Sequence, residues 1–258
     1  TNTTLKMIRH FVLPDTQVKH GVPLDHLTWA GRYVAEKKPD VIVCMGDFAD
    51  MESLSSYDVG RKSFEGRSYK ADIEIAHKAM GMFLDPIKEL QQQQRRNKEK
   101  IYKPRYIFTL GNHEQRIERA IDQDRKLDGL VSIRDLPLSG WEVYDFLQPV
   151  VVDGICYSHY FTSGQLGRPC VSARQILTKK HMSCFAGHQQ GRDIAYSQRA
   201  DGKHMTAIIS GSFYQHEENY LNKQTNDHWH GCWMLNDVQD GSFDEMPLSI
   251  QYLRNKYG

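Results

Sequence analysis

The chain has 258 residues, of which 40% are hydrophobic and 25% charged, and this ordinary globular usage excludes a disordered or fibrous protein. Its 33 basic and 32 acidic side chains leave a formal net charge of +1, so no global field draws it to a polyanion or a membrane surface. We expect a single domain over residues 1–258.

Membrane insertion and a disulfide scaffold are both disfavoured. No stretch approaches the roughly 20 apolar residues of a membrane helix, and the N-terminal residues lack a basic-then-apolar secretion pattern. The five cysteines are odd in number and form no CxxC pair. We therefore favour reduced core thiols and a cytoplasmic location.

Hydrophobic patterning predicts alternating strands and helices in the first half of the chain. The expected elements are a strand at 7–13, a helix at 24–38, a strand at 41–45, a helix at 69–94 with a kink near Pro86, a strand at 106–110 and a helix starting near His113. Pro39 stops the first helix because proline lacks the backbone N–H that a helix interior needs.

The second half is richer in strands. A hairpin is expected at 150–152 and 155–158 because Asp153-Gly154 between them is a typical two-residue turn. A helix at 171–180 and strands at 184–186, 194–198, 205–210, 232–236 and 248–253 follow. This order predicts an α/β fold, a layered α/β sandwich with mixed central sheets flanked by helices.

Side chains able to bind a metal follow five of the predicted strands. They are Asp15 with Gln17, Asp47, Asn112 with His113, His159, and His188 with Gln190. Each alone has a structural explanation, such as a turn, a helix N-cap or a core histidine. Since ligands in open α/β sheets collect at the carboxyl ends of strands, five such ends together predict a metal site.

The order of these blocks resembles the calcineurin-like metallophosphoesterase superfamily, whose pattern runs D-x-H, G-D-x-x-[DE], G-N-H-[DE], a later His and G-H-x-H. Here the blocks read Asp15-Thr16-Gln17, Gly46-Asp47-Phe48-Ala49-Asp50, Gly111-Asn112-His113-Glu114, His159 and Gly187-His188-Gln189-Gln190. The resemblance covers about residues 7–240. The middle two blocks match fully and the outer two each depart by one residue. Residues 46–70 also resemble small phosphoesterases found in phage genomes.

The resemblance implies an enzyme of the metallophosphoesterase type over the whole domain, with two divalent cations that share Asp47. One cation would be held by Asp15, Gln17 and Gln190, and the other by Asn112, His159 and His188. A hydroxide bridging the cations would attack phosphorus. His113 would be the catalytic histidine beside the substrate, and Glu114 would orient it.

Two glutamines stand where the family pattern has imidazoles. The first site then becomes an all-oxygen set, which suits Mn²⁺ or Mg²⁺, whereas the imidazoles of the second site suit Mn²⁺, Fe²⁺ or Zn²⁺. We expect Mn²⁺, with weaker binding at the first site. Two alternatives stay open: decay to a non-catalytic scaffold, and replacement of a glutamine by His20 or His181.

Candidate substrate contacts are basic and aromatic. They are Arg61, Lys62 and Arg67 in the loop after the Gly-Asp block, Arg116 after the Gly-Asn-His block, and Tyr214 with His216 in a later loop. Alternating cations and aromatic rings are typical of nucleic-acid contacts, although a solvated loop explains residues 57–70 equally well. We favour a phosphodiesterase acting on DNA, RNA or nucleotides. The alternative is a phosphomonoesterase acting on nucleotides or phosphoproteins, and no obligate protein partner is inferred.

Overall fold

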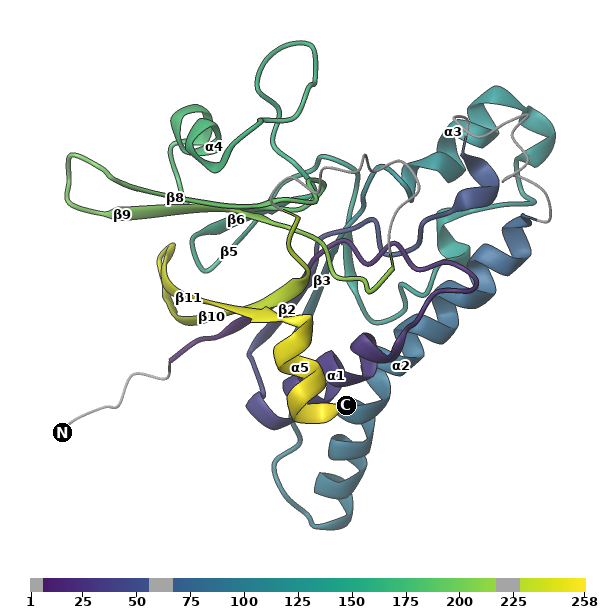
Figure 1. The fold of residues 1–258 in the computed structure, drawn as a ribbon, viewed down its shortest axis with the longest axis horizontal. Coiled ribbons are helices and arrows are strands. Elements are labelled where there is room, and N and C mark those ends of the chain that lie inside the picture. The colour runs from purple at the N-terminus through teal and green to yellow at the C-terminus, as the bar shows by residue number, and fades with distance from the viewer. Residues whose placement is uncertain (1–6, 56–66, 217–227) are drawn as a thin grey trace.

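The computed structural model describes residues 7–55, 67–216 and 228–258. Two mixed β-sheets pack face to face, with helices on their outer faces (Figure 1). The predicted α/β sandwich with mixed sheets and flanking helices is therefore confirmed.

The first sheet has six strands in the order β11-β10-β1-β2-β3-β4. Their bounds are β1 His10–Leu13, β2 Val41–Cys44, β3 Arg105–Thr109, β4 Glu142–Tyr144, β10 Gly231–Gln239 and β11 Ser242–Ser249. Strands β1 to β4 run parallel, while β10 is antiparallel to β1 and to β11. Because β1, β2 and β3 are parallel neighbours, the segments that follow them emerge at one edge of the sheet.

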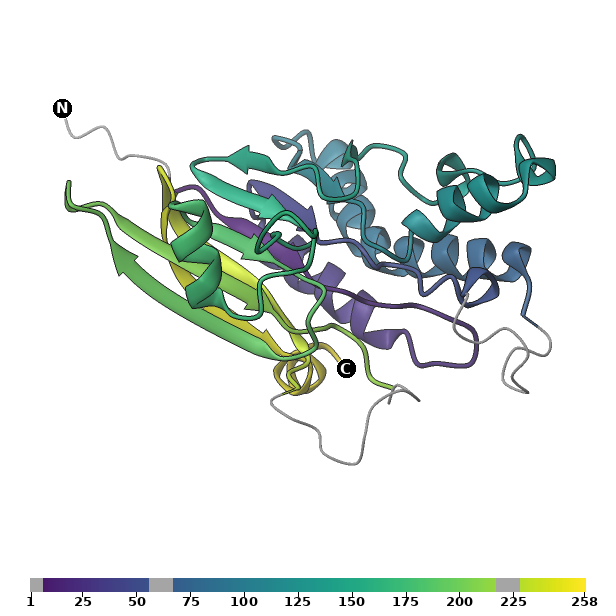
Figure 2. The same cartoon turned by 90° about the horizontal axis from the view of Figure 1, so that it is seen from above.

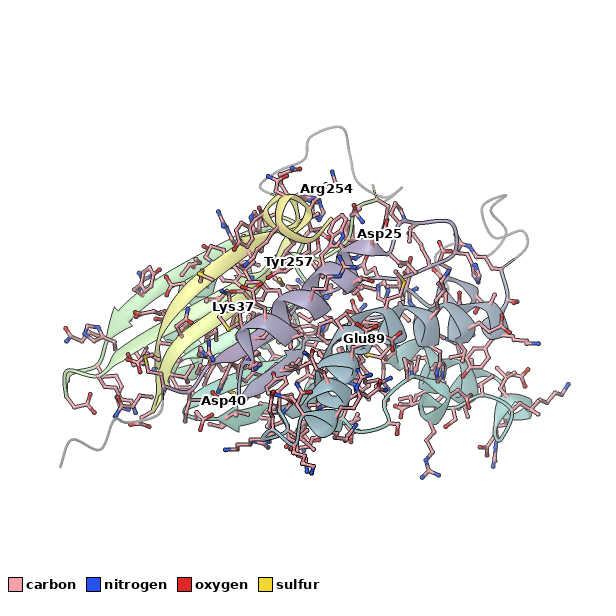
Figure 3. All side chains as sticks on the ribbon, turned by 90° about the horizontal axis from the view of Figure 1, so that it is seen from below. Asp25, Lys37, Asp40, Glu89, Arg254 and Tyr257 are labelled. Carbon is pink, nitrogen blue, oxygen red and sulfur yellow. The ribbon has the colours of Figure 1, made fainter. Side chains whose placement is uncertain are left out.

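Three helices cover the outer face of this sheet: α1 Asp25–Lys37, α2 Tyr69–Arg96 and α5 Ile250–Tyr257 (Figure 3). Helix α1 ends where Lys38 takes a left-handed conformation with φ of 52°, and α2 begins where the Ser68 side chain accepts a hydrogen bond from the Ala71 amide. Gly31 allows α1 to approach α2 closely, because a Cβ there would lie 2.2 Å from the Phe83 carbonyl oxygen.

The second sheet has five strands in the order β5-β6-β7-β9-β8. Their bounds are β5 Val150–Val152, β6 Ile155–Ser158, β7 Cys184–Ala186, β8 Arg192–Gln198 and β9 His204–Ser210. Helix α4, Ala173–Lys180, lies on the outer face of this sheet (Figure 2). The Asp-Gly hairpin is confirmed, since β5 and β6 pair antiparallel around Asp153 and Gly154, both with positive φ.

The sandwich core lies between the two sheets, and a second core lies under the helices. Val12 and Val43 face the second sheet. In the space between the sheets they pack in one cluster with Trp233 of β10 and with Phe185 of the second sheet. Phe11, in contrast, packs with the helical cluster. Burial on both faces explains why these strands appear as continuous apolar runs in the sequence rather than as alternating patterns.

The C-terminal prediction was wrong in part. Residues 248–253 were expected to form a strand, but β11 ends at Ser249 and α5 begins at Ile250. The Ser249 side chain accepts a hydrogen bond from the Tyr252 amide and so caps the helix, while Ile250 and Leu253 are buried on its inner face.

The remaining elements are short. Within the described ranges they are α3 Gln115–Gln123 and the 3-10 turns Glu52–Leu54, Arg125–Leu127 and Ile133–Asp135. These turns and the three-residue strand β4 were not predicted. All five cysteines are buried and unbridged. None of the helices in the described part of the chain combines the length and apolar character needed to span a bilayer.

Candidate metal centre

The predicted metal ligands converge at the carboxyl edge of the two sheets. An isolated bridge between Val18 and Ala49 joins the loops after β1 and β2, and one between Asp15 and Ser212 ties the loop after β1 to the second half of the chain. One pocket of about 590 Å³ opens there, lined among others by Gln17, Asp47, Asn112, His113, His188 and Gln190. These residues come from loops after four different strands, as the sequence predicted.

The tightest group surrounds the side-chain oxygen of Asn112. Its Oδ1 lies 3.0 Å from His159 Nε2 and 2.9 Å from His188 Nδ1. Asp47 Oδ2 lies 3.4 Å from His159 Nε2, and ligand atoms of Asp47, His159 and His188 all fall within 4.8 Å of one another. Two imidazole nitrogens, a carboxylate and an amide oxygen are a donor set suited to a divalent transition metal.

The orientation of the His159 ring fits a metal ligand. Its Nδ1 lies 2.7 Å from the Met45 carbonyl oxygen and must donate to it, so the neutral ring turns the Nε2 lone pair toward Asn112 Oδ1. A cation between these two acceptors would satisfy both. Burial lowers the pKa of His159, but the carboxylates of Asp47 and Asp15 outweigh burial and raise this pKa to about 10, so without a cation the ring itself carries the positive charge that these carboxylates favour.

His188 presents the neutral form that binds metals. Burial, reinforced by His159, lowers the pKa of the ring to about 4. The ring is also fixed through its backbone, since φ is 68° and the amide donates to both carboxylate oxygens of Asp15 at 3.1 Å. Asp15 therefore holds the His188 loop in place, in addition to facing the site.

Two of the residues expected at the other metal, Gln17 and Gln190, line the same pocket. Asp15 is buried, and burial raises its pKa to about 7 although His159 opposes this. The backbone amide of Gln17 donates to the backbone carbonyl oxygen of Asp47 at 2.9 Å. The side-chain oxygen of Gln190 accepts a hydrogen bond from the Tyr214 hydroxyl. Carboxylate and amide oxygens thus border the same space as the imidazole group.

Glu114 was expected to orient His113, but its carboxylate instead joins the loops after β2 and β3. Its carboxylate accepts backbone hydrogen bonds from Gly111 at 2.7 Å and from Asp47 and Phe48 at 2.8 Å each. These loops touch so closely that a Cβ at Gly111 would lie 2.1 Å from Asp47 Oδ1. Glu114 therefore holds the Asp47 backbone in position.

Asp50 is the carboxylate that faces the His113 ring. Its Oδ1 lies 3.0 Å from Nδ1, while Nε2 lies 3.7 Å from Asp47 Oδ2. Burial lowers the pKa of His113, but Asp47 and Asp50 outweigh it and raise this pKa above its usual value. Asp50 stands at the last position of the G-D-x-x-[DE] block, and this position is the sequence signal for a functional role that was not predicted.

The four basic residues predicted as substrate contacts have different places. Arg116 lies at the site: its Nη2 is 3.2 Å from His113 Nε2 and its Nη1 donates to the Asp50 carbonyl oxygen at 2.7 Å. Arg67 forms an ion pair with Glu52 at 3.4 Å. Arg61 and Lys62 lie outside the described residues.

Tyr214 and His216 form a layer behind the pocket. Tyr214 is only 1% exposed, and its ring stacks on His216 with a centroid distance of 4.4 Å. Through its hydroxyl, Tyr214 holds Gln190 rather than facing solvent. The interpretation of these two residues as direct substrate contacts stays a prediction.

The two alternative ligands lie elsewhere. His20 Nε2 is 3.0 Å from the Ala71 carbonyl oxygen, and His181 is the left-handed C-cap of α4. The sequence reasoning also missed part of the pocket wall, formed by Pro169, Cys170, Val171, Gln189, Gly191 and His228. Gln189 stands at the variable position of the last family block, and the other five residues belong to segments without a family motif, so no sequence signal marked them.

No protein-family model and no curated protein matches the sequence. Among solved structures, the chain is similar to a dimetal phosphatase from Danio rerio, with 10% identity, coverage of 94% of this chain and 96% of that one, and a TM-score of 0.44. It is also similar to a purple acid phosphatase from yellow lupin (Lupinus luteus) seeds, with 11% identity, coverage of 95% and 54%, and a TM-score of 0.33. Likenesses this low carry no argument about function, which must come from the site itself.

Proposed function

We propose that this chain is a binuclear metal-dependent phosphoesterase formed by one domain over residues 1–258, and that its substrates are phosphodiesters of nucleic acids or nucleotides. The observation that supports the proposal is the convergence of His159 Nε2, His188 Nδ1 and Asp47 Oδ2 around Asn112 Oδ1. Imidazole, carboxylate and amide groups at such distances form a donor set that a shared cation would bind.

The proposal keeps the two donor sets expected from the sequence. Asn112, His159 and His188 would hold one cation, Asp15, Gln17 and Gln190 the other, and Asp47 both. When bound, divalent cations neutralise phosphate oxygens and lower the pKa of a coordinated water. Mn²⁺ suits both sets, and the set with two glutamines lacks imidazole nitrogens, so we expect the weaker affinity there.

The chain's own residues would handle the leaving group. His113 lies on the pocket and its raised pKa favours the protonated ring, so it can donate a proton to the departing oxygen. Asp50 at 3.0 Å positions that ring. Arg116, next to His113 Nε2, places a positive charge where a phosphate oxygen would lie.

The direct test is hydrolysis of bis-p-nitrophenyl phosphate, p-nitrophenyl phosphate, and single-stranded and duplex DNA, each with Mn²⁺ and with chelator. We expect Mn²⁺-dependent diester cleavage that falls about 10³-fold in Asp47→Asn, since a shared ligand is removed. Asp122→Asn, at an exposed position of α3, is the matched control. Activity that survives both chelator and Asp47→Asn contradicts the proposal, and exclusive monoester cleavage selects the phosphomonoesterase.

Metal analysis tests the predicted asymmetry separately. Protein stripped by chelator and titrated with Mn²⁺ should fill one site before the other. Equal affinity at both sites would contradict the assignment of the glutamine-containing set to a weaker site.

A further inference from the structure

A second pocket, of about 310 Å³, lies at an open edge of the sandwich. It is bordered by the first residue of β8, by Trp229 just before β10, and by the end of β11 with the start of α5; the lining residues are Arg192, Trp229, Met246, Pro247, Leu248, Ser249 and Tyr252. Strands β8 and β11 are the edge strands of their respective sheets. The pocket volume is at the lower end of the range for small-ligand sites.

The Trp229 indole is a fixed wall of this pocket. A Cβ at Gly231 would lie 2.4 Å from the indole, and one at Gly211 would lie 3.1 Å from it. Trp233 packs against it at a centroid distance of 5.2 Å. Glycine at both positions therefore leaves the space that the ring fills, and the ring needs no rearrangement before a ligand arrives.

The pocket combines one positive charge with exposed apolar surface. The Arg192 guanidinium lies 4.9 Å from the centroid of the Trp229 ring, and Arg192 has no ion pair with any described residue. Tyr252 is 43% and Met246 38% exposed. An exposed aromatic group beside a guanidinium suits a ligand that offers both a flat ring and an anion.

This pocket adjoins the metal pocket along the backbone. Gly191 and His228 line the metal pocket and form a β-bridge with each other. The next residue in each segment, Arg192 and Trp229, lines the second pocket. The Trp229 amide also donates to the Gln190 carbonyl oxygen at 3.2 Å. The two pockets are therefore one residue apart along both of these segments.

We propose that the Arg192–Trp229 pocket is a nucleotide subsite for single-stranded nucleic acid, which holds a unit next to the phosphodiester at the metals. The inference rests on the proposed function and narrows its substrate class. Tyr252 and Trp229 provide surface for a base, and Arg192 provides a contact for the adjacent phosphate. A small diester would occupy only the metal pocket, so the subsite favours oligonucleotides over it.

Binding of a fluorescently labelled single-stranded oligodeoxynucleotide, followed by anisotropy in chelator, tests the subsite without catalysis. Arg192→Glu and Tyr252→Ala should each raise Kd about tenfold, as expected for the loss of one stacking or phosphate contact. Arg254→Glu is the matched control, because that guanidinium also lies over a tryptophan, 5.5 Å from the Trp29 centroid, but outside the pocket. Equal Kd values for all variants would overturn the subsite.

Catalysis separates this inference from the proposed function. With Mn²⁺, the ratio of kcat/KM for the oligonucleotide to kcat/KM for bis-p-nitrophenyl phosphate should fall about tenfold in both pocket variants and stay constant in Arg254→Glu. If the protein hydrolyses diesters but the pocket variants change neither the kcat/KM ratio nor the Kd for the oligonucleotide, the subsite is overturned and the proposed function stands. No diester hydrolysis, together with a raised Kd in the pocket variants, contradicts the proposed function while supporting the nucleotide site.

Discussion

At the scale of single residues, the carboxylates around His113 have separate tasks. Asp50 faces the ring at 3.0 Å, whereas Glu114 accepts three backbone amides. We expect Asp50→Asn to lower kcat for a nucleoside leaving group by about 10-fold to 100-fold and His113→Ala to lower it by about 10²- to 10⁴-fold. p-Nitrophenolate departs without a proton, so the p-nitrophenyl diester should lose less in both variants. Equal losses for the two leaving groups would contradict proton donation by His113.

At the scale of elements, the site depends on the close approach of the loops after β2 and β3. A Cβ at Gly111 would lie 2.1 Å from Asp47 Oδ1, so Gly111→Ala should displace Asp47 and abolish Mn²⁺ binding. Gly81 in α2 has open space around its Cα, and Gly81→Ala should stabilise the protein by about 0.5–1 kcal/mol through helix propensity. Calorimetric titration with Mn²⁺ measures the effect of Gly111→Ala, and denaturant unfolding measures that of Gly81→Ala. Tight Mn²⁺ binding by Gly111→Ala would show that the close approach of the two loops is not needed for the site.

The sequence was informative about elements wherever burial decides the pattern. Buried strands such as β2 and their loop residues, Asp47 among them, followed from apolar runs and motif spacing. The helix at Ile250 did not, because residues 248–253 alternate like a strand and the Ser249 cap with burial against the fold decides the outcome. The G-D-x-x-[DE] block marks Asp50 as a functional candidate, but its contact with His113 depends on loop conformations such as φ of 46° at Asp47.

At the scale of the whole molecule, His26 couples the fold to pH. It packs on Phe213 at a centroid distance of 4.8 Å, and Gln215 Nε2 lies 3.2 Å from its Nδ1. Burial lowers its pKa from 6.5 to about 3. The unfolded chain therefore takes up a proton at His26 near pH 6.5, and the folded chain does not. The contribution of the neutral His26 ring to the free energy of unfolding is complete above pH 6.5 and falls as the pH drops toward 3.

This linkage costs the protein about 2 kcal/mol of unfolding free energy between pH 8 and pH 5. His26→Gln keeps a polar side chain without a titrating group, and it should lose about 2 kcal/mol less than the wild type over the same interval. Urea unfolding at both pH values measures the difference. Identical pH dependence in the two proteins would show that His26 is protonated in the folded state.

A binuclear site requires distant segments of the chain to meet around a pair of cations. The most direct measurement is anomalous diffraction from crystals of the protein soaked in Mn²⁺. We predict two peaks, one in contact with Asn112, His159 and His188 and one in contact with Asp15, Gln17 and Gln190, with Asp47 touching both. Absence of anomalous density at these residues, or peaks confined to other parts of the surface, would contradict the assignment of a binuclear metal site.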